Sequence, residues 1–319
     1  MPRIGESLRD LTFSTAALDR RADRRVEPDL IPRLLVDPAT RVVEVRGDRA
    51  AVRPGGDGGP SLVTRPPRVG DEDGLVIYLG TAVDGGGPTD GEGPAYVAVV
   101  RLEEAEPTEE WRTLRQVGAD LDAVDAAVWV AAQGVANWHR VHGFCPRCGQ
   151  PTEVAQAGWV RRCPADESLH FPRTDPAVIM AVVDEDDRLL LARGRGFNTI
   201  GMSVLAGFVE PGETLAAAVA REVKEEVGLD VTDVTYLGDQ PWPFPSSLMV
   251  GFRARARGGR VRMQESEIEA VRWFSREELL AAIAAGELAI SPRVSIARRL
   301  IEDWFGGPVD SPEVSLRRR

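Results

Sequence analysis

The segment 207–229, with the sequence GFVEPGETLAAAVAREVKEEVGL, constrains this chain more than any other stretch. A glycine-rich loop leads into a predicted helix, and Thr214 is a suitable N-cap because its hydroxyl can accept a hydrogen bond from a free backbone N–H. Gly228 is a typical helix stop. The residues that recur every four positions as an apolar stripe are Leu215, Val219, Val223 and Val227. The segment therefore predicts an amphipathic helix that packs on a core.

Three glutamates lie together on a second face of this helix. Glu222, Glu225 and Glu226 occupy positions i, i+3 and i+4, so their carboxylates crowd one patch. Like charges this close are unfavourable unless a cation lies among them, and magnesium or manganese suits an all-oxygen ligand set. The plain alternative is an acidic helix face in contact with water. The fixed neighbours of these glutamates favour a site for a divalent cation.

Those neighbours match a known signature. Gly207 is followed after five residues by Glu213 and after seven more by Arg221 and the three glutamates, and the segment ends in a glycine and an aliphatic residue. This is the Nudix box at every position. The chain therefore resembles the Nudix hydrolases, which cleave nucleoside diphosphates linked to another moiety. We expect Arg221 and Glu213 to form an ion pair that fixes the loop to the helix.

Composition and charge exclude other classes of protein. With 43% apolar and 28% charged residues, the chain has the composition of an ordinary globular protein. No apolar run approaches the roughly 18 residues of a membrane span, and the N-terminus lacks the core of a signal peptide, so we expect a cytoplasmic protein with no membrane partner. The net charge of −11 argues against broad electrostatic binding of nucleic acid.

The pattern along the 319 residues divides the chain into four parts. These are an N-terminal mixed α/β domain at 1–135, a zinc ribbon at 136–173, a Nudix domain at 174–306 and a flexible tail at 307–319. In the first part we expect strands at 41–46, 75–79 and 95–101, loops at 54–60 and 84–88, and a helix within 119–141. It carries no catalytic signature, so it is expected to support or dimerise the enzyme.

The Nudix part reads as a mixed sheet between helices, and the expected fold class is α+β with an α-β-α Nudix domain. Its predicted strands are 177–183, 188–193, 231–237, 247–254 and 269–274, and its predicted later helices are 276–285 and 296–305.

All three cysteines fall in one cluster with zinc-ribbon spacing. Cys145 and Cys148 form a CxxC knuckle, and Cys163 follows fourteen residues later. Asp166 stands where a ribbon has its fourth cysteine, and a carboxylate can bind zinc. We therefore expect a structural zinc ion with a Cys3Asp ligand set.

Other interpretations of the cluster remain open. His170 and His142 are rival fourth ligands, and each can equally be a histidine that hydrogen bonds near the metal. The cluster is otherwise a degenerate ribbon without metal, or Cys145 and Cys148 form a redox pair. Because no reaction centre lies beside the cluster, a zinc ion here is structural.

The stretch 240–247, QPWPFPSS, points to the substrate. Its three prolines stiffen the loop, leave no regular strand to form, and hold Trp242 and Phe244 in place to stack on a nucleobase or a nicotinamide ring. The plain alternative is a packed proline–aromatic corner. The loop resembles the SQPWPFPxS signature of the NADH pyrophosphatase branch of the Nudix family, which also has the zinc ribbon, although Asp239 stands where the signature has serine.

This resemblance implies hydrolysis of NADH, and more slowly of NAD, to a nicotinamide mononucleotide and AMP. It also implies removal of NAD caps from RNA 5′ ends, and a homodimer whose subunits build each site together. Glu222, Glu225 and Glu226 would bind Mg²⁺ or Mn²⁺, and Glu226 would orient or deprotonate the attacking water. Glu267 would complete the metal site, with Glu269 as its substitute.

The resemblance also implies substrate contacts. Phe208 and Trp242 would sandwich the nicotinamide, from opposite subunits. The further candidates for substrate binding are Gln240, Phe244, Ser247, Met249 and Ala297.

Three rival functions are compatible with parts of the sequence. A pyrophosphatase for ADP-ribose or another dinucleotide would have the same box and metals. A non-catalytic NAD sensor would keep the fold but would usually lose box glutamates. An RNA-processing factor would use arginines of the ribbon to steer RNA, namely Arg147, Arg161 and Arg162.

Overall fold

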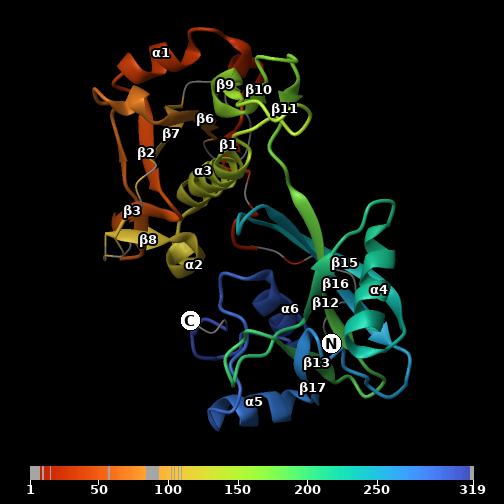
Figure 1. Ribbon diagram of the computed structural model, residues 1–319. Helices are drawn as coiled ribbons and strands as arrows, with labels where there is room; N and C mark the ends of the chain where they lie inside the picture. Colours follow the sequence, from red (N-terminus) through yellow and green to blue (C-terminus); the bar gives the residue numbers. More distant parts are fainter. Residues whose placement is uncertain are drawn as a thin grey trace. The chain divides into compact units, whose positions relative to one another are not determined.

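The structure is a computed structural model that describes residues 8, 11–14, 16–56, 58–83, 93–101, 103, 105–106, 108 and 110–316. The chain forms two compact units, each with its own sheet and core (Figure 1). The C-terminal unit comprises Met1–Thr12, Asp175–Gln240 and Ser247–Arg319, and the N-terminal unit comprises Phe13–Thr174 and Pro241–Ser246. The chain therefore enters the N-terminal unit twice.

The N-terminal unit is built on a mixed sheet that has eight strands among the described residues. The strand order is β1-β6-β7-β2-β3-β4, β5 pairs with β2, β8 pairs with β3, and β2 and β7 run parallel. The strands are β1 (Leu18–Asp19), β2 (Arg41–Arg46), β3 (Arg49–Pro54), β4 (Pro60–Leu62), β5 (Thr64–Arg65), β6 (Leu75–Ala82), β7 (Ala95–Arg101) and β8 (Trp111–Thr113). The expected strands at 41–46, 75–79 and 95–101 are thus confirmed, while the expected loop at 84–88 lies outside the described residues.

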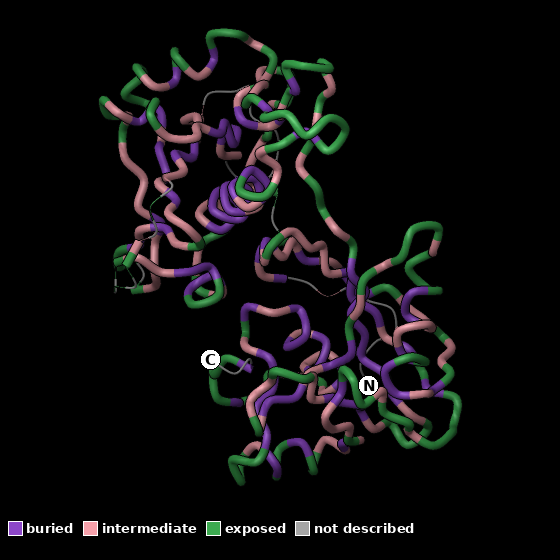
Figure 2. Tube along the Cα trace, viewed as in Figure 1, coloured by how far each residue is buried: buried purple, intermediate pink, exposed green. Residues whose placement is uncertain are grey.

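Helices pack against this sheet. They are α1 (Leu30–Val36), α2 (Leu114–Val117) and α3 (Ala123–Val141), with 3-10 turns η1 (Ala22–Val26), η2 (Asp71–Asp73), η3 (Gly118–Asp120) and η4 (Gln156–Gly158). Asp122 caps α3 by accepting a hydrogen bond from the backbone N–H of Asp125 at 2.8 Å. Figure 2 shows α3 buried along most of its length, so it is the central helix of this unit.

The ribbon is a small antiparallel sheet in the same unit, with strand order β11-β10-β9. Its strands are β9 (Glu153–Ala155), β10 (Val160–Arg162) and β11 (Leu169–His170). His139 of α3 links helix and ribbon, because its Nε2 lies 2.7 Å from the Gly158 oxygen and its Nδ1 2.9 Å from Nη1 of Arg161. Burial lowers the pKa of His139 to about 4, so the neutral ring donates to Gly158 and accepts from Arg161.

The C-terminal unit contains a mixed sheet with the order β15-β16-β12-β13-β17, and β14 pairs with β12. Its strands are β12 (Asp175–Val183), β13 (Leu189–Gly194), β14 (Leu205–Phe208), β15 (Val231–Trp242), β16 (Ser247–Ala256) and β17 (Ile268–Phe274). Its helices are α4 (Leu215–Val227), α5 (Arg276–Ala284) and α6 (Ile296–Phe305). β12 and β16 run parallel, whereas β12 pairs antiparallel with β13 and β14, and β13 pairs antiparallel with β17.

Alternation along β12 divides this unit into two cores. Val178, Met180 and Val182 pack in one core with α4. Ile179, Ala181 and Val183 point to the other face and pack in a second core with α5 and α6. Figure 1 shows α4 and α6 on opposite sides of the sheet. The expected α-β-α arrangement is confirmed. Among the described residues, the structure contains no helix long and apolar enough to cross a membrane.

Two details differ from the expectations. The prolines of 240–247 do not end the strand at once, because β15 continues through Pro241 and Trp242. β15 is an edge strand, where a residue without an N–H is tolerated. Residues 307–316 are not a free tail, because Val309 and Leu316 are buried and the Asn198 side chain donates to the Ser315 oxygen at 2.8 Å. Residues 317–319 lie outside the described part of the chain.

Candidate active site

Helix α4 begins and ends as its sequence predicts. Thr214 Oγ1 accepts from the Ala217 N–H at 3.2 Å, and Gly228 closes the helix with φ 73°. The apolar residues of the last three turns, Val219, Val223 and Val227, are completely buried, whereas Leu215 in the first turn is 38% exposed. The helix is therefore fixed on the sheet by its later turns, which also carry the glutamates.

Gly207 leaves the space that the first glutamate of the helix occupies. It lies in β14, opposite Val178 of β12. A Cβ atom added to Gly207 would lie 1.9 Å from Cδ of Glu222, far inside contact distance. The Glu222 carboxylate thus lies directly against the backbone of β14. A residue with a Cβ atom in place of Gly207 would displace this carboxylate.

Arg221 is hydrogen bonded to the loop and to two of the glutamates. Its Nε and Nη2 donate to the two carboxylate oxygens of Glu213 at 2.9 and 3.0 Å, and Nη2 also donates to the Phe208 oxygen at 2.8 Å. Its Nη1 donates to Glu222 at 2.9 Å and to Glu225 at 3.2 Å. The expected Arg221–Glu213 ion pair is confirmed, and these contacts, with Glu213 first, raise the pKa of Arg221.

Glu226 is the most unusual side chain of the box. It is 8% exposed, and its Oε2 atom is buried without a hydrogen-bond partner among the residues that the structure describes. Burial, and then the charges of Glu222, Glu267 and Glu225, raise the pKa of Glu226 to about 8. Burial is also the main cause that raises the pKa of Glu222. A buried carboxylate among like charges needs a cation beside it.

Glu267 joins this group from the segment before β17. Its charge raises the pKa of both Glu222 and Glu226. The segment is fixed to the end of α4 because the Gln264 N–H donates to the Glu226 backbone oxygen at 2.9 Å. Glu269, the substitute candidate, lies two residues further on, within β17.

The residues present fit a hard divalent cation, because the donors are all carboxylate oxygens and one of them is buried with no hydrogen-bond partner in the described structure. Among the described residues, the carboxylate oxygens of the box and Glu267 do not lie as close together as the four candidate ligand atoms of the ribbon. Arg221 lies between Glu222 and Glu225 and supplies positive charge to both.

Two predicted substrate contacts occupy positions inside the protein. Gln240 is completely buried, its Nε2 donates to the Thr12 and Val294 oxygens at 2.7 and 2.9 Å, and its Oε1 accepts from the Ile296 N–H at 2.8 Å. The amide of Gln240 thus joins the segment at Thr12 to the start of α6 and is not available to a ligand. Ala297, in the first turn of α6, is 2% exposed and belongs to the core that α5 and α6 share.

The other predicted contacts are more accessible. Phe208 is 60% exposed, and Ser247 is half-buried. Met249 is partly buried against the core of α5 and α6. Phe208 belongs to the C-terminal unit and Trp242 to the N-terminal unit, so the expected sandwich of these two rings stays a prediction.

Trp242 and Phe244 form an aromatic pair, with ring centroids 4.9 Å apart at 75°. Two residues outside the sequence motifs also contact this loop. The guanidinium of Arg115 lies 4.0 Å from the Phe244 centroid and 5.0 Å from that of Trp242, and Asn137 of α3 donates to two loop carbonyls. Neither residue lies in a motif, so the sequence carried no signal for them.

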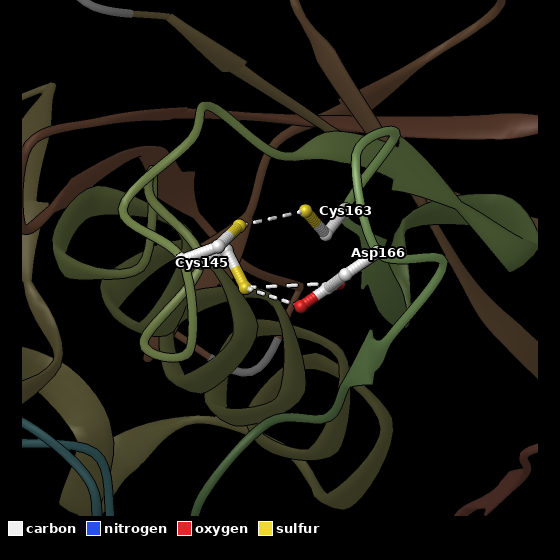
Figure 3. A group of neighbouring side chains, drawn as sticks. Cys145, Cys163 and Asp166 are labelled. Atoms are coloured by element: carbon white, nitrogen blue, oxygen red, sulfur yellow. Dashed lines mark hydrogen bonds between the residues drawn. The ribbon is translucent and has the colours of Figure 1, made fainter.

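The ribbon cysteines converge as the spacing predicts (Figure 3). The ligand atoms of Cys145, Cys148, Cys163 and Asp166 all lie within 4.8 Å of one another. Sγ of Cys148 and Cys163 are 3.4 Å apart, and Sγ of Cys145 lies 3.7 Å from Oδ2 of Asp166. Two ligands of a tetrahedral zinc ion are roughly 3.8 Å apart at metal–sulfur distances of about 2.3 Å, so the group fits zinc.

The rival ligands lie outside this group of four. His170 Nε2 lies 3.1 Å from Ser168 Oγ. His142 Nδ1 lies 3.0 Å from the Trp138 backbone oxygen, to which it donates a hydrogen bond. The structure therefore favours Asp166 as the fourth ligand.

Comparison with known proteins agrees with both sites. Residues 173–294 match the family model of the NUDIX domain. This part of the chain is a Nudix domain. Residues 140–171, directly before it, match the NADH pyrophosphatase zinc ribbon domain. The Nudix domain thus contains the box, Glu267 and the QPWPFP loop, and the ribbon domain contains the four candidate zinc ligands.

Curated proteins also match a large part of the chain. The chain is 44% identical over 200 residues to "NAD-capped RNA hydrolase NudC" of Mycobacterium bovis, covering 60% of this chain and 64% of that protein. It is 41% identical over 193 residues to "NAD-capped RNA hydrolase NUDT12" of Homo sapiens, covering 57% of this chain and 42% of that protein. The chain therefore spans less than two thirds of the length of these relatives. A solved Nudix hydrolase of Nitrosomonas europaea aligns with a TM-score of 0.41 and 23% identity, over 52% of this chain and 94% of that one.

Proposed function

We propose that this protein hydrolyses the diphosphate bond of NADH and NAD to give a nicotinamide mononucleotide and AMP, and that it also removes NAD caps from RNA 5′ ends. The names of the relatives, the NADH pyrophosphatase type of ribbon and the QPWPFP loop support this substrate class. We further propose a homodimer, which the resemblance to the family implies, and a cytoplasmic location.

One observation carries the reaction type. Within the described part of the chain, the buried Oε2 of Glu226 has no hydrogen-bond partner, and Glu222 and Glu267 add their negative charges nearby. A carboxylate in this position is costly for the fold unless it has a task with a cation or a proton. The complete box also argues against a sensor that only binds NAD.

Glu222, Glu225, Glu226 and Glu267 would hold Mg²⁺ or Mn²⁺, which when bound offsets the charge of the diphosphate and lowers the pKa of bound water. Arg221 keeps the first two of these side chains in place. Glu226 accepts the proton of the attacking water, a role that suits a carboxylate whose pKa is raised towards neutrality. One phosphorus–oxygen bond forms as the bridging bond breaks, which releases the two mononucleotides.

The exposed Phe208 ring and the Trp242–Phe244 pair offer flat surfaces for the nicotinamide ring. Ser247 and Met249, at the start of β16, are the remaining candidates for contact with the nucleotide. Gln240 and Ala297 act from inside the fold, where they fix the loop and α6.

Product analysis tests the substrate class. The purified protein is incubated with NADH, NAD, an NAD-capped RNA or ADP-ribose, each with Mg²⁺ and with Mn²⁺, and the products are separated by chromatography. We expect reduced nicotinamide mononucleotide and AMP from NADH, and slower cleavage of ADP-ribose. Equal rates on ADP-ribose and NADH would support a general dinucleotide pyrophosphatase instead, and binding of NADH without cleavage would support the sensor.

A further inference from the structure

The tip of the β15–β16 hairpin, residues 241–246, belongs to the N-terminal unit, where α3 contacts it through Asn137. Nδ2 of Asn137 donates to the Pro243 oxygen at 2.9 Å and to the Pro245 oxygen at 3.0 Å. Prolines have no N–H, so a proline-rich loop offers few donors of its own to these carbonyls. One amide group therefore fixes the backbone on both sides of Phe244.

The orientation of the Asn137 amide is itself set by α3. Gln133, one turn earlier, donates from Nε2 to Oδ1 of Asn137 at 2.9 Å and to the Gly47 oxygen at 3.2 Å. Gln133 is 1% exposed, so it has little freedom to turn. With its oxygen facing this donor, Asn137 directs its NH₂ group to the loop.

Packing supports the same loop. Pro243 is buried, and a Cβ atom added to Gly134 of α3 would lie 3.9 Å from its Cβ, in ordinary van der Waals contact. The Arg115 guanidinium lies over Phe244 and Trp242. The aromatic pair is thus supported by the helix at its backbone and by a cation at its rings.

We propose that Asn137 is a positioning residue for substrate binding, which holds the Trp242–Phe244 loop in the form that receives the nicotinamide ring. This inference rests on the proposed function and extends it to a residue outside the Nudix domain. A loop that is already ordered loses less conformational entropy when the substrate binds, so affinity depends on the support of the loop. The N-terminal unit then contains both the loop and the residue that holds it.

The variant Asn137→Asp tests this role. It keeps the size of the side chain and the oxygen that faces Gln133, but it replaces the NH₂ group with an oxygen that faces the two loop carbonyls. Binding is measured by calorimetry without divalent metal, so that nothing is hydrolysed. We expect NADH affinity to fall about tenfold, while ADP-ribose, which lacks the nicotinamide, changes less than about twofold. Asn137→Ala removes the donors without adding charge and is expected to act in the same direction.

Hydrogen exchange supplies a second readout that needs no ligand. The amides of 242, 244, 246 and 247 are expected to exchange faster in both Asn137 variants, while the strands of both sheets keep their protection. Gln156→Glu makes the same amide-to-carboxylate change at an exposed position of the N-terminal unit and is expected to alter neither readout.

The outcomes are distinct. Unchanged NADH affinity in the Asn137 variants, or an equal loss for NADH and ADP-ribose, overturns the positioning role while the proposed function stands. If the unmodified protein does not bind NADH, the proposed function and the substrate role of Asn137 both fail, and hydrogen exchange alone decides whether Asn137 restrains the loop.

Discussion

At the scale of single residues, the site depends on one glycine and one buried carboxylate. Gly207 makes room for the Glu222 carboxylate, and Oε2 of the buried Glu226 has no hydrogen-bond partner among the described residues. The sequence predicted that these residues belong together, because the spacing of the box is fixed. It could not predict that Gln240 is completely buried, because a glutamine beside two aromatic residues has the same pattern whether it faces a ligand or a core.

The variant Gly207→Ala is expected to separate stability from activity. The added methyl group meets the end of a flexible side chain, so Glu222 moves while the fold remains, and the free energy of unfolding changes by less than about 1 kcal/mol. Displacement of the Glu222 carboxylate lowers NADH turnover about 100-fold. Steady-state kinetics and urea unfolding check this prediction.

Gly143→Ala is the matched control, because the added Cβ atom would meet no described atom within 4 Å. Gly196→Ala is unsuitable as a control, because Gly196 has a positive φ. Full turnover in Gly207→Ala would show that the Glu222 carboxylate does not need this space.

At the scale of elements, α3 joins parts of the chain that the sequence separated. We expected a domain boundary between residues 135 and 136, but α3 runs through it from Ala123 to Val141. His139 then connects the helix to the ribbon at Gly158 and Arg161. The sequence showed the helical period but not these partners, because hydrogen bonds between distant segments leave no periodic pattern.

The His139 contact predicts a pH dependence of stability. Burial lowers the pKa of His139 from 6.5 to about 4, so the unfolded chain binds a proton in this window and the folded chain does not. The contribution of His139 is complete above pH 6.5 and is lost as the pH falls towards 4, by up to about 3 kcal/mol. Urea unfolding of the protein and of His139→Gln, from pH 4 to 7.5, should show stability curves that converge towards low pH. Parallel curves would show that the ring does not titrate in this window.

The ribbon gives a prediction about metal content. Asp166 lies in the group of four ligand atoms, so Asp166→Ala leaves three ligands and is expected to lose zinc on dialysis against a mild chelator, while Asp166→Cys keeps it. Zinc per protein is measured by mass spectrometry, with the exposed Glu153→Ala as the matched control. Equal zinc retention in Asp166→Ala and the control would assign the fourth position to another ligand.

At the scale of the whole molecule, periodicity predicted the sheets well, since buried strands and amphipathic helices leave regular patterns. Periodicity does not predict the structure of a segment that is held only by contacts with distant residues. We expected a flexible tail at 307–319, yet in its described part Val309 and Leu316 are buried and Nε of Arg293 lies 3.5 Å from Oε1 of Glu313. The fold therefore includes almost all of the described C-terminus, and the sequence pattern alone could not show which isolated apolar residues are buried.

The departure at Asp239 also has a local explanation. The Tyr236 hydroxyl donates to the Asp239 carboxylate, and this contact is the main cause that raises the pKa of Tyr236 to about 12. The charge that replaces the serine of the signature is thus partnered by a neighbour in β15. We expect the effect of Asp239 on substrate preference to be indirect.

We infer that the buried Glu226 carboxylate is held for catalysis at a cost to stability. Its pKa is raised from 4.5 to about 8, so in metal-free protein its contribution to stability falls as the pH rises through this window. The most direct measurement compares Glu226→Gln with the unmodified protein, by NADH product analysis with Mg²⁺ and by urea unfolding at pH 7 without divalent metal other than zinc. We predict at least about 100-fold slower turnover in the variant and a stability higher by up to about 3 kcal/mol. Normal turnover, or a variant that is less stable at pH 7, would contradict the account.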